Sequence, residues 1–487
     1  MQIYNSLTKR KDPFEPTDGK TVRIYACGPT VYDYSHIGHA RVYVVWDVIQ
    51  RYLRFKGYHL TYVRNITDIE DKIINKAKEE GIRPEQVARK YLYEFWRDME
   101  ALNTQAPDFE PRATEFVPQM IEFVKGLIAK GKAYESGGDV YFDVKSATKY
   151  GQLTKQNLDE MVTGSRDLVL SQEDLKERKR HPADFALWKS AGKGEYGWPS
   201  PWGFGRPGWH LECSTMIKHG LGDTIDMHGG GEDLLFPHHE NEIAQTEGLD
   251  NKPLARFWVH NSFVQVNSEK MSKSLGNFTT IRELLKNYSA DELRLFILQT
   301  HYRNPIDFSV DGLQAAKTGM QRLIRAVHDD APASGNGCEV TQPQVSAIKG
   351  RMIHQLLKVD PEKEQVKTRL EKEFAEAMED DFNTAKAVAF LFGLADSIGA
   401  AKDKGDKEFY VQALKDYANV LGFKLEDTRK ILPGETASQL MDLILSLRAE
   451  SKQRKDYATS DLIRKRLSDC GVNVMDTADG ATWETSS

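Results

Sequence analysis

Apolar and polar positions follow two different periods in the first part of the chain, and together they predict a strand, a helix and a second strand. Short β-rich apolar runs at 22–26 and 58–64 predict two buried strands. Between them, apolar residues recur at helical spacing and predict a helix over 40–56, which Gly57 would end. This order is that of a βαβ unit, in which ligands bind at the carboxyl end of the strand, against the helix start.

The α/β pattern is interrupted and then returns. Segment 112–207 changes character and ends in a stretch crowded with Gly and Pro, which predicts an insertion. Beyond it, 224–228 predicts another buried strand, glycines 229–231 predict the turn after it, and 237–247 predicts a helix with proline in its first turn. The sequence therefore predicts one α/β domain in two halves.

The remainder predicts mainly helices. Short strands are expected at 257–260 and 263–266, and from 281 to the end the pattern is mostly helical. A helix pair over 366–404 is broken at 381–384, where Asn383 and its neighbours offer an N-cap. The expected fold class is an α/β, Rossmann-like parallel-sheet domain split by an insertion, followed by a mainly helical region and a small C-terminal domain.

Length and composition narrow the class of protein. A chain of 487 residues is too long for one core, and it holds no apolar run that could span a membrane. Its N-terminus lacks a signal-peptide core, so we expect a cytoplasmic protein without a membrane partner. Four scattered cysteines indicate reduced thiols. A net charge of −6 excludes a global basic surface, so any nucleic-acid binding must come from local patches.

The turn before the first helix carries candidate chemistry. Residues 36–39 read His-Ile-Gly-His, which places His36 and His39 three apart at a helix start. Imidazoles there can donate to phosphate oxygens in a transition state, and Gly38 removes a side chain where a nucleotide would press. The structural alternative is a capping histidine with a helix-start glycine.

A second candidate is the run Lys-Met-Ser-Lys-Ser at 270–274. Lys270 and Lys273 would form a cationic loop that closes on a triphosphate and stabilises charge on the leaving pyrophosphate. The alternative is a solvated loop of lysine and serine. Because the two strings occur in this order, with half of an α/β domain between them, nucleotide chemistry is favoured.

These motifs carry a resemblance to a known family. Residues 36–39 match the HIGH signature, and residues 270–274 match the KMSKS signature, of class I aminoacyl-tRNA synthetases. The wider context resembles the cysteinyl-tRNA synthetase family and extends over essentially the whole chain. The stretches that resemble it are 27–33, 64–68, 184–189, 208–214, 228–231, 236–242 and 380–384.

The resemblance implies a reaction in two steps. The carboxylate of L-cysteine attacks the α-phosphorus of ATP, which Mg²⁺ accompanies, and cysteinyl-adenylate and pyrophosphate form. The terminal ribose of tRNA(Cys) then takes the cysteinyl group. It implies that His36 and His39 contact phosphate, that Gly38 lies against the nucleotide, and that Lys270 and Lys273 stabilise pyrophosphate.

Other residues are expected around the substrates. The resemblance places Thr67 and Trp209 in the amino-acid pocket. Asp233, after the glycine run, is a candidate for a ribose contact, with a helix N-cap as the alternative.

The resemblance also implies one zinc ion per chain, on Cys27, Cys213, His238 and Glu242. Cysteine spacing alone does not reveal this site, but two thiolates, an imidazole and a carboxylate suit Zn²⁺. His238 and Glu242 are four apart on a predicted helix and would share a face, whereas His239 would lie about 100° round it. Zinc fits the task because a soft thiolate binds it far better than the hydroxyl of serine does, so no editing domain is needed.

His210 and His228 also lie near these positions in the sequence, but the family gives them no ligand role. Glu240 cannot share a helix face with His238.

The expected division of the chain follows the family. Residues 1–111 and 208–250 would form the catalytic domain, 112–207 the insertion, 251–310 the KMSKS-loop and stem-contact region, 311–425 the anticodon-binding helical bundle, and 426–487 the small C-terminal domain. A local basic excess near the end favours RNA contact and consists of Arg448, Lys452, Arg454, Lys455, Arg464, Lys465 and Arg466. We expect a monomer.

Two other functions stay open. A related ligase uses the same core to join cysteine to an amino sugar, but it is expected to lack the long C-terminal part. The other is a catalytically inactive, zinc-stabilised RNA-binding protein, against which the intact histidine and lysine motifs argue.

Overall fold

The structure is a computed structural model that describes residues 1–156, 158, 178–192, 194–266, 269–270, 279–328, 361–426, 434–469, 472–477 and 480–485. Lys273, Cys338 and Cys470 lie outside these ranges. The chain divides into two compact units, Met1–Leu425 and Glu426–Ser487. Within the described ranges, no helix combines the length and apolar character needed to cross a membrane.

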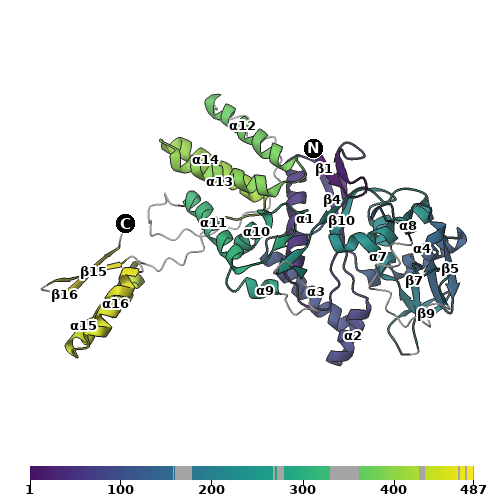
Figure 1. Ribbon diagram of the computed structural model, residues 1–487, viewed down its shortest axis with the longest axis horizontal. Coiled ribbons are helices and arrows are strands. Elements are labelled where there is room, and N and C mark those ends of the chain that lie inside the picture. The colour runs from purple at the N-terminus through teal and green to yellow at the C-terminus, as the bar shows by residue number, and fades with distance from the viewer. Residues whose placement is uncertain are drawn as a thin grey trace. The chain divides into compact units, whose positions relative to one another are not determined.

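A parallel sheet of four strands forms the centre of the first unit (Figure 1). Its strand order is β11-β10-β3-β4, and every neighbouring pair is parallel. The strands are β3 (Thr21–Ala26), β4 (His59–Arg64), β10 (Ile225–Gly231) and β11 (Ala255–Asn261). Because β3 pairs with β10, the two halves that the sequence separates meet in one sheet, as the split α/β pattern predicts.

Helices cover the two faces of this sheet (Figure 1). Helix α1 (Ile37–Phe55) packs with α10 (Ala290–Leu298) and α14 (Lys404–Val420), and α7 (Trp209–Gly220) packs with α8 (Glu240–Asp250). Side chains alternate along β3: Ile24 belongs to the core around α1, whereas Tyr25 and Cys27 share a second core with residues of α7 and α8. The alternation therefore places Cys27 on the same side as Cys213.

Helix α1 begins earlier than the periodicity predicts. It begins at Ile37, three residues before the expected start at residue 40, and His36 is its N-cap. Its other end agrees with the sequence, because Gly57 follows the C-cap Lys56 with φ +88°.

The insertion contains more regular structure than predicted. After α4 (Val117–Ala129), an antiparallel sheet takes the order β5-β6-β7-β9-β8. Its strands are Ala133–Ser136, Asp139–Phe142, Phe185–Ser190, Trp198–Ser200 and Gly203–Pro207 for β5 to β9. The sequence pattern predicts only the second, as a strand over 140–144, because strands of three to six residues give weak periodicity and β8 and β9 are also interrupted by Pro or Gly.

The predicted turn at glycines 229–231 is wrong. These residues are the last three of β10, and they pair with Val259, His260 and Asn261 of β11. A Cβ atom on Gly229 would lie 1.8 Å from the Val259 carbonyl oxygen. The glycines thus allow a close approach of neighbouring backbones rather than a reversal of the chain.

The predicted helix over 237–247 is also shifted. Helix α8 is Glu240–Asp250, and the segment before it consists of a short 3₁₀ turn (Glu232–Leu234) and an irregular wide turn (Leu235–His239). Phe236 is extended, with φ −140° and ψ 136°, and the Phe236-Pro237 bond is cis. A residue before proline disfavours the helical region, which explains the late start.

The other elements of the first unit follow the expected order, with mainly helices after α9. Asn383 caps α13 by accepting a hydrogen bond from Lys386 N–H, as predicted. The remaining bounds are β1 (Gln2–Asn5), β2 (Arg10–Pro13), α2 (Asp71–Glu80), α3 (Pro84–Ala101), β12 (Val264–Val266), β13 (Glu269–Lys270), α9 (Ile281–Leu284), β14 (Ile306–Asp307), α11 (Val310–His328), α12 (Pro361–Met378) and α13 (Thr384–Ala400).

The second unit pairs two helices with a hairpin that the sequence pattern missed. Helices α15 (Gly434–Gln453) and α16 (Tyr457–Asp469) precede β15 (Val472–Thr477) and β16 (Gly480–Thr485), which pair antiparallel. The expectation of helices to the end is therefore wrong for the last two elements. Arg448, expected at an RNA-binding surface, is instead buried and pairs with Asp476 at 2.7 Å.

Candidate functional site

The His-Ile-Gly-His motif forms the N-terminus of α1, where unpaired N–H groups need acceptors. His36 Nδ1 accepts a hydrogen bond from Gly38 N–H at 3.1 Å, and His39 Nδ1 accepts one from His36 N–H at 3.2 Å. Backbone N–H groups can only donate, so both Nδ1 atoms are unprotonated and each neutral ring carries its hydrogen on Nε2. The capping alternative thus describes a real role, and it leaves both rings with an Nε2–H donor for a phosphate oxygen.

Gly38 has a second function that its sequence context did not reveal. A Cβ atom at this position would lie 2.8 Å from His36 Cε1. The glycine therefore makes room for the capping ring, in addition to the expected room for a nucleotide.

The lysine motif is anchored at both ends. Lys270 ends β13, whose backbone pairs with Gln265 of β12, while Lys273 lies outside the described residues. Thr279, after the motif, accepts a hydrogen bond from Ile37 N–H at 3.2 Å, and Ile281 N–H donates to Ser35 O at 2.9 Å. The segment that follows the second motif is thus hydrogen-bonded to the first motif, although the two are far apart in the sequence.

Arg41 ties the same helix to the strand that leads into the lysine motif. Its buried guanidinium donates to the carbonyls of Phe263 at 2.6 Å and Tyr302 at 3.0 Å. Phe263 directly precedes β12, so one side chain of α1 fixes the approach to Lys270. Burial lowers the pKa of Arg41 to about 10, which leaves it charged at neutral pH.

A buried cluster of metal-binding side chains lies between the end of β3 and helices α7 and α8. Cys27 Sγ is 3.8 Å from Cys213 Sγ, which is 3.5 Å from His238 Nε2. His238 Nε2 is 2.8 Å from Glu242 Oε1. The four donor atoms all lie within 4.8 Å of one another, and the structure thereby brings together the four predicted ligands.

This geometry fits a tetrahedral zinc ion. Two sulfurs that each lie about 2.3 Å from such an ion are about 3.8 Å apart, and the two cysteine sulfurs have that separation. Both cysteines are free thiols, and the donor set is the mixture of soft sulfur, imidazole and carboxylate that zinc accepts.

Burial and neighbouring side chains shift the pKa values of these ligands. Burial opposes ionisation of Cys213, but hydrogen bonds from Cys27 and His238 lower its pKa to about 6. Burial likewise opposes the charge on Glu242, and His228 and His238 lower its pKa to about 2. Burial raises the pKa of Cys27 well above its usual range, and its hydrogen bond with Cys213 adds to that effect. These contacts thus favour the thiolate of Cys213 and the carboxylate of Glu242, which are the forms that bind a metal.

His239 lies closer to the cluster than helical geometry predicts. Its Nε2 is 3.3 Å from Cys27 Sγ, and the set Cys27, His228, His239 and Glu242 also lies within 4.8 Å. The expectation that His239 points elsewhere fails because the turn Leu235–His239 is not α-helical.

Other buried histidines contact the side chains of this cluster. His228 donates from Nδ1 to Tyr25 O at 2.9 Å, and its Nε2 holds Glu242 Oε2 at 2.6 Å. His210 Nδ1 lies 2.9 Å from His238 Nδ1, and His260 Nε2 lies 2.8 Å from His239 Nδ1. His210 and His228 sit next to predicted ligands in the sequence, but only the fold reveals their contacts.

The predicted pocket residues have different positions. Trp209 stacks on His238, with ring centroids 4.2 Å apart. Thr67 is buried, and its hydroxyl lies 2.8 Å from Glu212 Oε2. Asp233 is exposed, within the 3₁₀ turn that follows β10, and the N-cap of that turn is Gly231, so the N-cap alternative for Asp233 is wrong.

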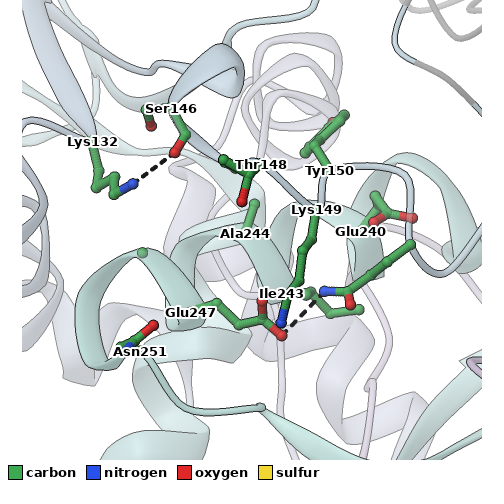
Figure 2. A pocket seen from close by; sticks show the side chains of 13 residues that line it. Lys132, Ser146, Thr148, Lys149, Tyr150, Glu240, Ile243, Ala244, Glu247 and Asn251 are labelled. Atoms are coloured by element: carbon green, nitrogen blue, oxygen red, sulfur yellow. Dashed lines mark hydrogen bonds between the residues drawn. The ribbon is translucent and has the colours of Figure 1, made fainter.

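A separate pocket of about 150 Å³ lies on the outer side of α8 (Figure 2). Glu240, the first residue of α8, accepts hydrogen bonds from Gly151, Leu153 and Thr154 N–H at 2.9 to 3.0 Å. Its carboxylate therefore fixes the start of α8 against the insertion, on a different face from Glu242, as the helical spacing predicts.

Comparisons with known proteins agree with this architecture. Residues 13–318 match the family model described as tRNA synthetases class I (C) catalytic domain, and residues 373–426 match the DALR domain. The chain is 44% identical over 498 residues to a cysteine--tRNA ligase of Heliobacterium modesticaldum, covering 99% of each chain. It is 44% identical over 499 residues to that of Moorella thermoacetica, covering 100% of each.

Solved structures support the fold at much lower identity. An arginyl-tRNA synthetase structure from Campylobacter jejuni has a TM-score of 0.54 at 13% identity, covering 85% of this chain and 95% of that one. A Mycobacterium tuberculosis methionyl-tRNA synthetase has a TM-score of 0.53 at 15% identity, covering 82% and 89%.

Proposed function

Because the chain belongs to the class I tRNA synthetases, and within them to the cysteine--tRNA ligase family, we propose how its residues carry out cysteine activation. The protein is an ATP-dependent aminoacyl-tRNA ligase. The carboxylate of cysteine attacks the α-phosphorus of ATP, pyrophosphate leaves, and the terminal ribose of tRNA(Cys) takes the cysteinyl group from the adenylate. The observation that carries this assignment is the full-length similarity to cysteine--tRNA ligases, joined to a buried thiol cluster at the end of β3.

The residues at the start of α1 act on the phosphates. His36 and His39 donate from Nε2 to phosphate oxygens as charge develops, while their Nδ1 atoms remain engaged with the backbone. Lys270 and Lys273 stabilise the departing pyrophosphate, whose Mg²⁺ comes with ATP. Gly38 lies against the nucleotide, and Asp233, exposed at the carboxyl end of β10, contacts the ribose.

The amino acid is selected at the cysteine cluster. Cys27, Cys213, His238 and Glu242 would hold one zinc ion per chain. Of the two sets of donors that lie within 4.8 Å among the described residues, this one contains both thiols, which supports it. When bound, zinc offers a soft Lewis acid to the substrate sulfur, which the hydroxyl of serine cannot match at neutral pH. Trp209 covers His238, and Thr67 lines the pocket beside it.

The helical region and the second unit would bind tRNA. We divide the chain as the family suggests, with the catalytic halves in 1–111 and 208–250, the stem-contact region in 251–310, the anticodon-binding bundle in 311–425 and a small domain in 426–487. The match to the DALR domain at 373–426 supports the bundle assignment. We expect a monomer acting in the cytoplasm.

Aminoacylation of tRNA tests this function. The protein with ATP and labelled cysteine should produce acid-precipitable cysteinyl-tRNA from a tRNA(Cys) transcript and from no other tRNA transcript. Transfer to an amino sugar instead of tRNA would favour the sugar ligase, although relatives that match the chain end to end are tRNA ligases. No product with either acceptor would favour the inactive RNA-binding protein.

A further inference from the structure

We infer that Asp381 is a positioning residue that fixes the orientation of the helical bundle on the catalytic domain, so that a tRNA held by the bundle presents its terminal ribose at the start of α1. This inference rests on the proposed function and adds a residue to it, one that acts in the transfer to tRNA rather than in the formation of the adenylate. Asp381 lies between α12 and α13 and is completely buried, at 0% exposure.

The carboxylate of Asp381 joins the bundle to two segments of the catalytic part. Its Oδ1 accepts hydrogen bonds from Tyr4 N–H at 2.8 Å and from the Tyr302 hydroxyl at 2.6 Å. Its Oδ2 accepts one from Arg303 Nε at 2.7 Å. Because a backbone N–H and a guanidinium only donate, both carboxylate oxygens act as acceptors here. One side chain of the bundle therefore holds both strand β1 and residues 301–304, which follow α10.

The backbone at this position adds two contacts and a conformation that suits aspartate. Asp381 N–H donates to Gln2 O at 2.9 Å. Its carbonyl accepts from His301 Nε2 at 3.1 Å, and this nitrogen carries the ring hydrogen because Nδ1 accepts from Arg303 N–H. The φ angle of Asp381 is +64°, in the left-handed region that aspartate and asparagine adopt more readily than most other residues. Phe382 follows with φ +49°, so the surrounding contacts hold two consecutive residues in this region.

Residues 301–304 also contact the helix that begins with the His-Ile-Gly-His motif. Their side chains bind the bundle, whereas their backbone carbonyls accept from Arg41 of α1, at 3.0 Å for Tyr302 and with a further contact to Asn304. Strand β14 follows directly and pairs with β12, which in turn pairs with the strand that ends at Lys270. A continuous series of hydrogen bonds thus connects the bundle to both elements that carry the phosphate-binding motifs.

Apolar packing between the same elements does not by itself fix one orientation. Helix α1 packs with α14, and α10 packs with α11 and α13, within one hydrophobic core. Burial of apolar surface is non-directional, whereas hydrogen bonds to a buried carboxylate require one geometry. Without that carboxylate the bundle should stay attached but shift on the catalytic domain. Such a shift affects a tRNA that must reach both parts at once, and it does not affect cysteine and ATP, which bind in the catalytic domain alone.

The two half-reactions of the full-length protein separate this effect from general damage. Asp381→Asn keeps the size of the side chain and tolerates the left-handed φ, but whichever way its amide turns, an NH₂ group meets at least one of the three donors. We expect kcat/KM for a tRNA(Cys) transcript in aminoacylation to fall by about 10-fold or more, because the reacting ribose is misplaced. Cysteine-dependent ATP–pyrophosphate exchange should change by less than about 3-fold.

Asp226→Asn is the matched control. Asp226 is also completely buried and accepts hydrogen bonds from Thr17, Arg23 and Arg256, none of which belongs to the bundle. This variant should be destabilised in urea, because a buried carboxylate is lost there too, but its ratio of aminoacylation to exchange should equal that of the wild type.

A second variant repeats the test with Asp381 intact. Tyr302→Phe removes one donor of the Asp381 carboxylate but keeps the carbonyl that Arg41 binds. It should show the same selective loss of aminoacylation, and combining it with Asp381→Asn should cost less than the sum of the two single losses. Equal losses in both half-reactions, unchanged aminoacylation, or additive losses in the double variant would overturn the role of Asp381. Wild-type protein that fails to exchange with cysteine would instead overturn the proposed function.

Discussion

At the scale of single residues, each side chain of the candidate site has one chemical role. Hydrogen bonds from its neighbours lower the pKa of Cys213, and Glu242 is held through both oxygens by His238 and His228. His36 and His39 use one ring nitrogen each for the backbone and keep a donor hydrogen on the other. In the proposed function, recognition and activation therefore use separate side chains, which lie at the two ends of one strand-to-helix connection.

Cys213→Ser should lose the metal. A hydroxyl is a poor zinc ligand at neutral pH, so bound zinc should fall from about one ion per chain to a small fraction, and cysteine-dependent exchange should fall with it. Elemental analysis of the purified variant measures this. The matched control is His219→Ala, an exposed position on the same helix, which should retain zinc. Full zinc content in Cys213→Ser would contradict the ligand assignment.

At the scale of elements, the start of α1 combines a structural cap with the phosphate contacts that we propose. The helix caps itself with two histidines where serine, threonine or aspartate would serve for stability alone. Its backbone also pairs with residues 279–281, which begin five positions after the end of the lysine motif. The segment after the lysine motif is therefore joined through its backbone to the helix terminus that we propose binds phosphate.

His39→Ala should lower activity far more than stability. Loss of one preorganised donor should reduce kcat for pyrophosphate exchange by about 100-fold, whereas loss of the cap should lower the free energy of unfolding by about 1 kcal/mol. The control is Ser289→Ala, which removes the comparable capping box of α10. It should be destabilised by a similar amount in urea but exchange pyrophosphate normally. Equal activity losses in both variants would show that His39 acts only as a helix cap.

Arg41→Met tests the connection between α1 and the strand before the lysine motif. Its removal takes one donor from the carbonyls of Phe263 and Tyr302, which keep a backbone donor each, and removes the donor of the Asn304 carbonyl. The free energy of unfolding should fall by about 3 kcal/mol, and Arg41→Lys, which keeps the charge but not the fork, should recover only part of it. Urea denaturation of the three proteins measures both values, and an unaltered midpoint in Arg41→Met would refute the connection.

At the scale of the whole molecule, the catalytic sheet is assembled from two halves of the sequence, with a folded insertion between them. The second unit forms its own fold from two helices and a hairpin. Within that unit Arg448 is buried against Asp476, whereas Arg464, Lys465 and Arg466 are exposed on α16. The basic residues near the end thus divide into a structural one and an exposed group.

Removing the exposed charges should change the salt dependence of tRNA binding. Replacement of Arg464, Lys465 and Arg466 by alanine should weaken binding and reduce the slope of log K against log salt by about 2. The exposed Lys125→Ala on α4 is the control. Arg448→Ala should instead destabilise the second unit, because Asp476 loses the buried one of its two partners, Arg448 and Lys452. An unchanged slope in the triple variant would exclude α16 from the RNA-binding surface.

The sequence predicted the parts of this molecule that depend on local periodicity or on a family signature. The first βαβ unit, its glycine stop and the cap at Asn383 follow from short-range patterns. The shifted start of α8 and the strand through glycines 229–231 do not, because tertiary pairing with β11 and a proline override local preference.

The candidate site shows the same division. The pairing of His238 with Glu242 was expected from helical spacing, yet His238 precedes the helix and an irregular turn brings it into place. The same turn brings His239 to Cys27, which helical spacing excluded. Glu212 and Thr67 are 145 positions apart and meet only in the folded chain, so no sequence pattern signals their contact.

The most direct test of the account is ATP–pyrophosphate exchange with cysteine and with serine as the only amino acid. The thiol cluster predicts rapid exchange with cysteine, exchange with serine lower by about 10⁴-fold, and loss of the cysteine signal after zinc is removed by a chelator. Exchange that fails with cysteine, or that proceeds equally with serine, would contradict the claim that this cluster reads the substrate thiolate.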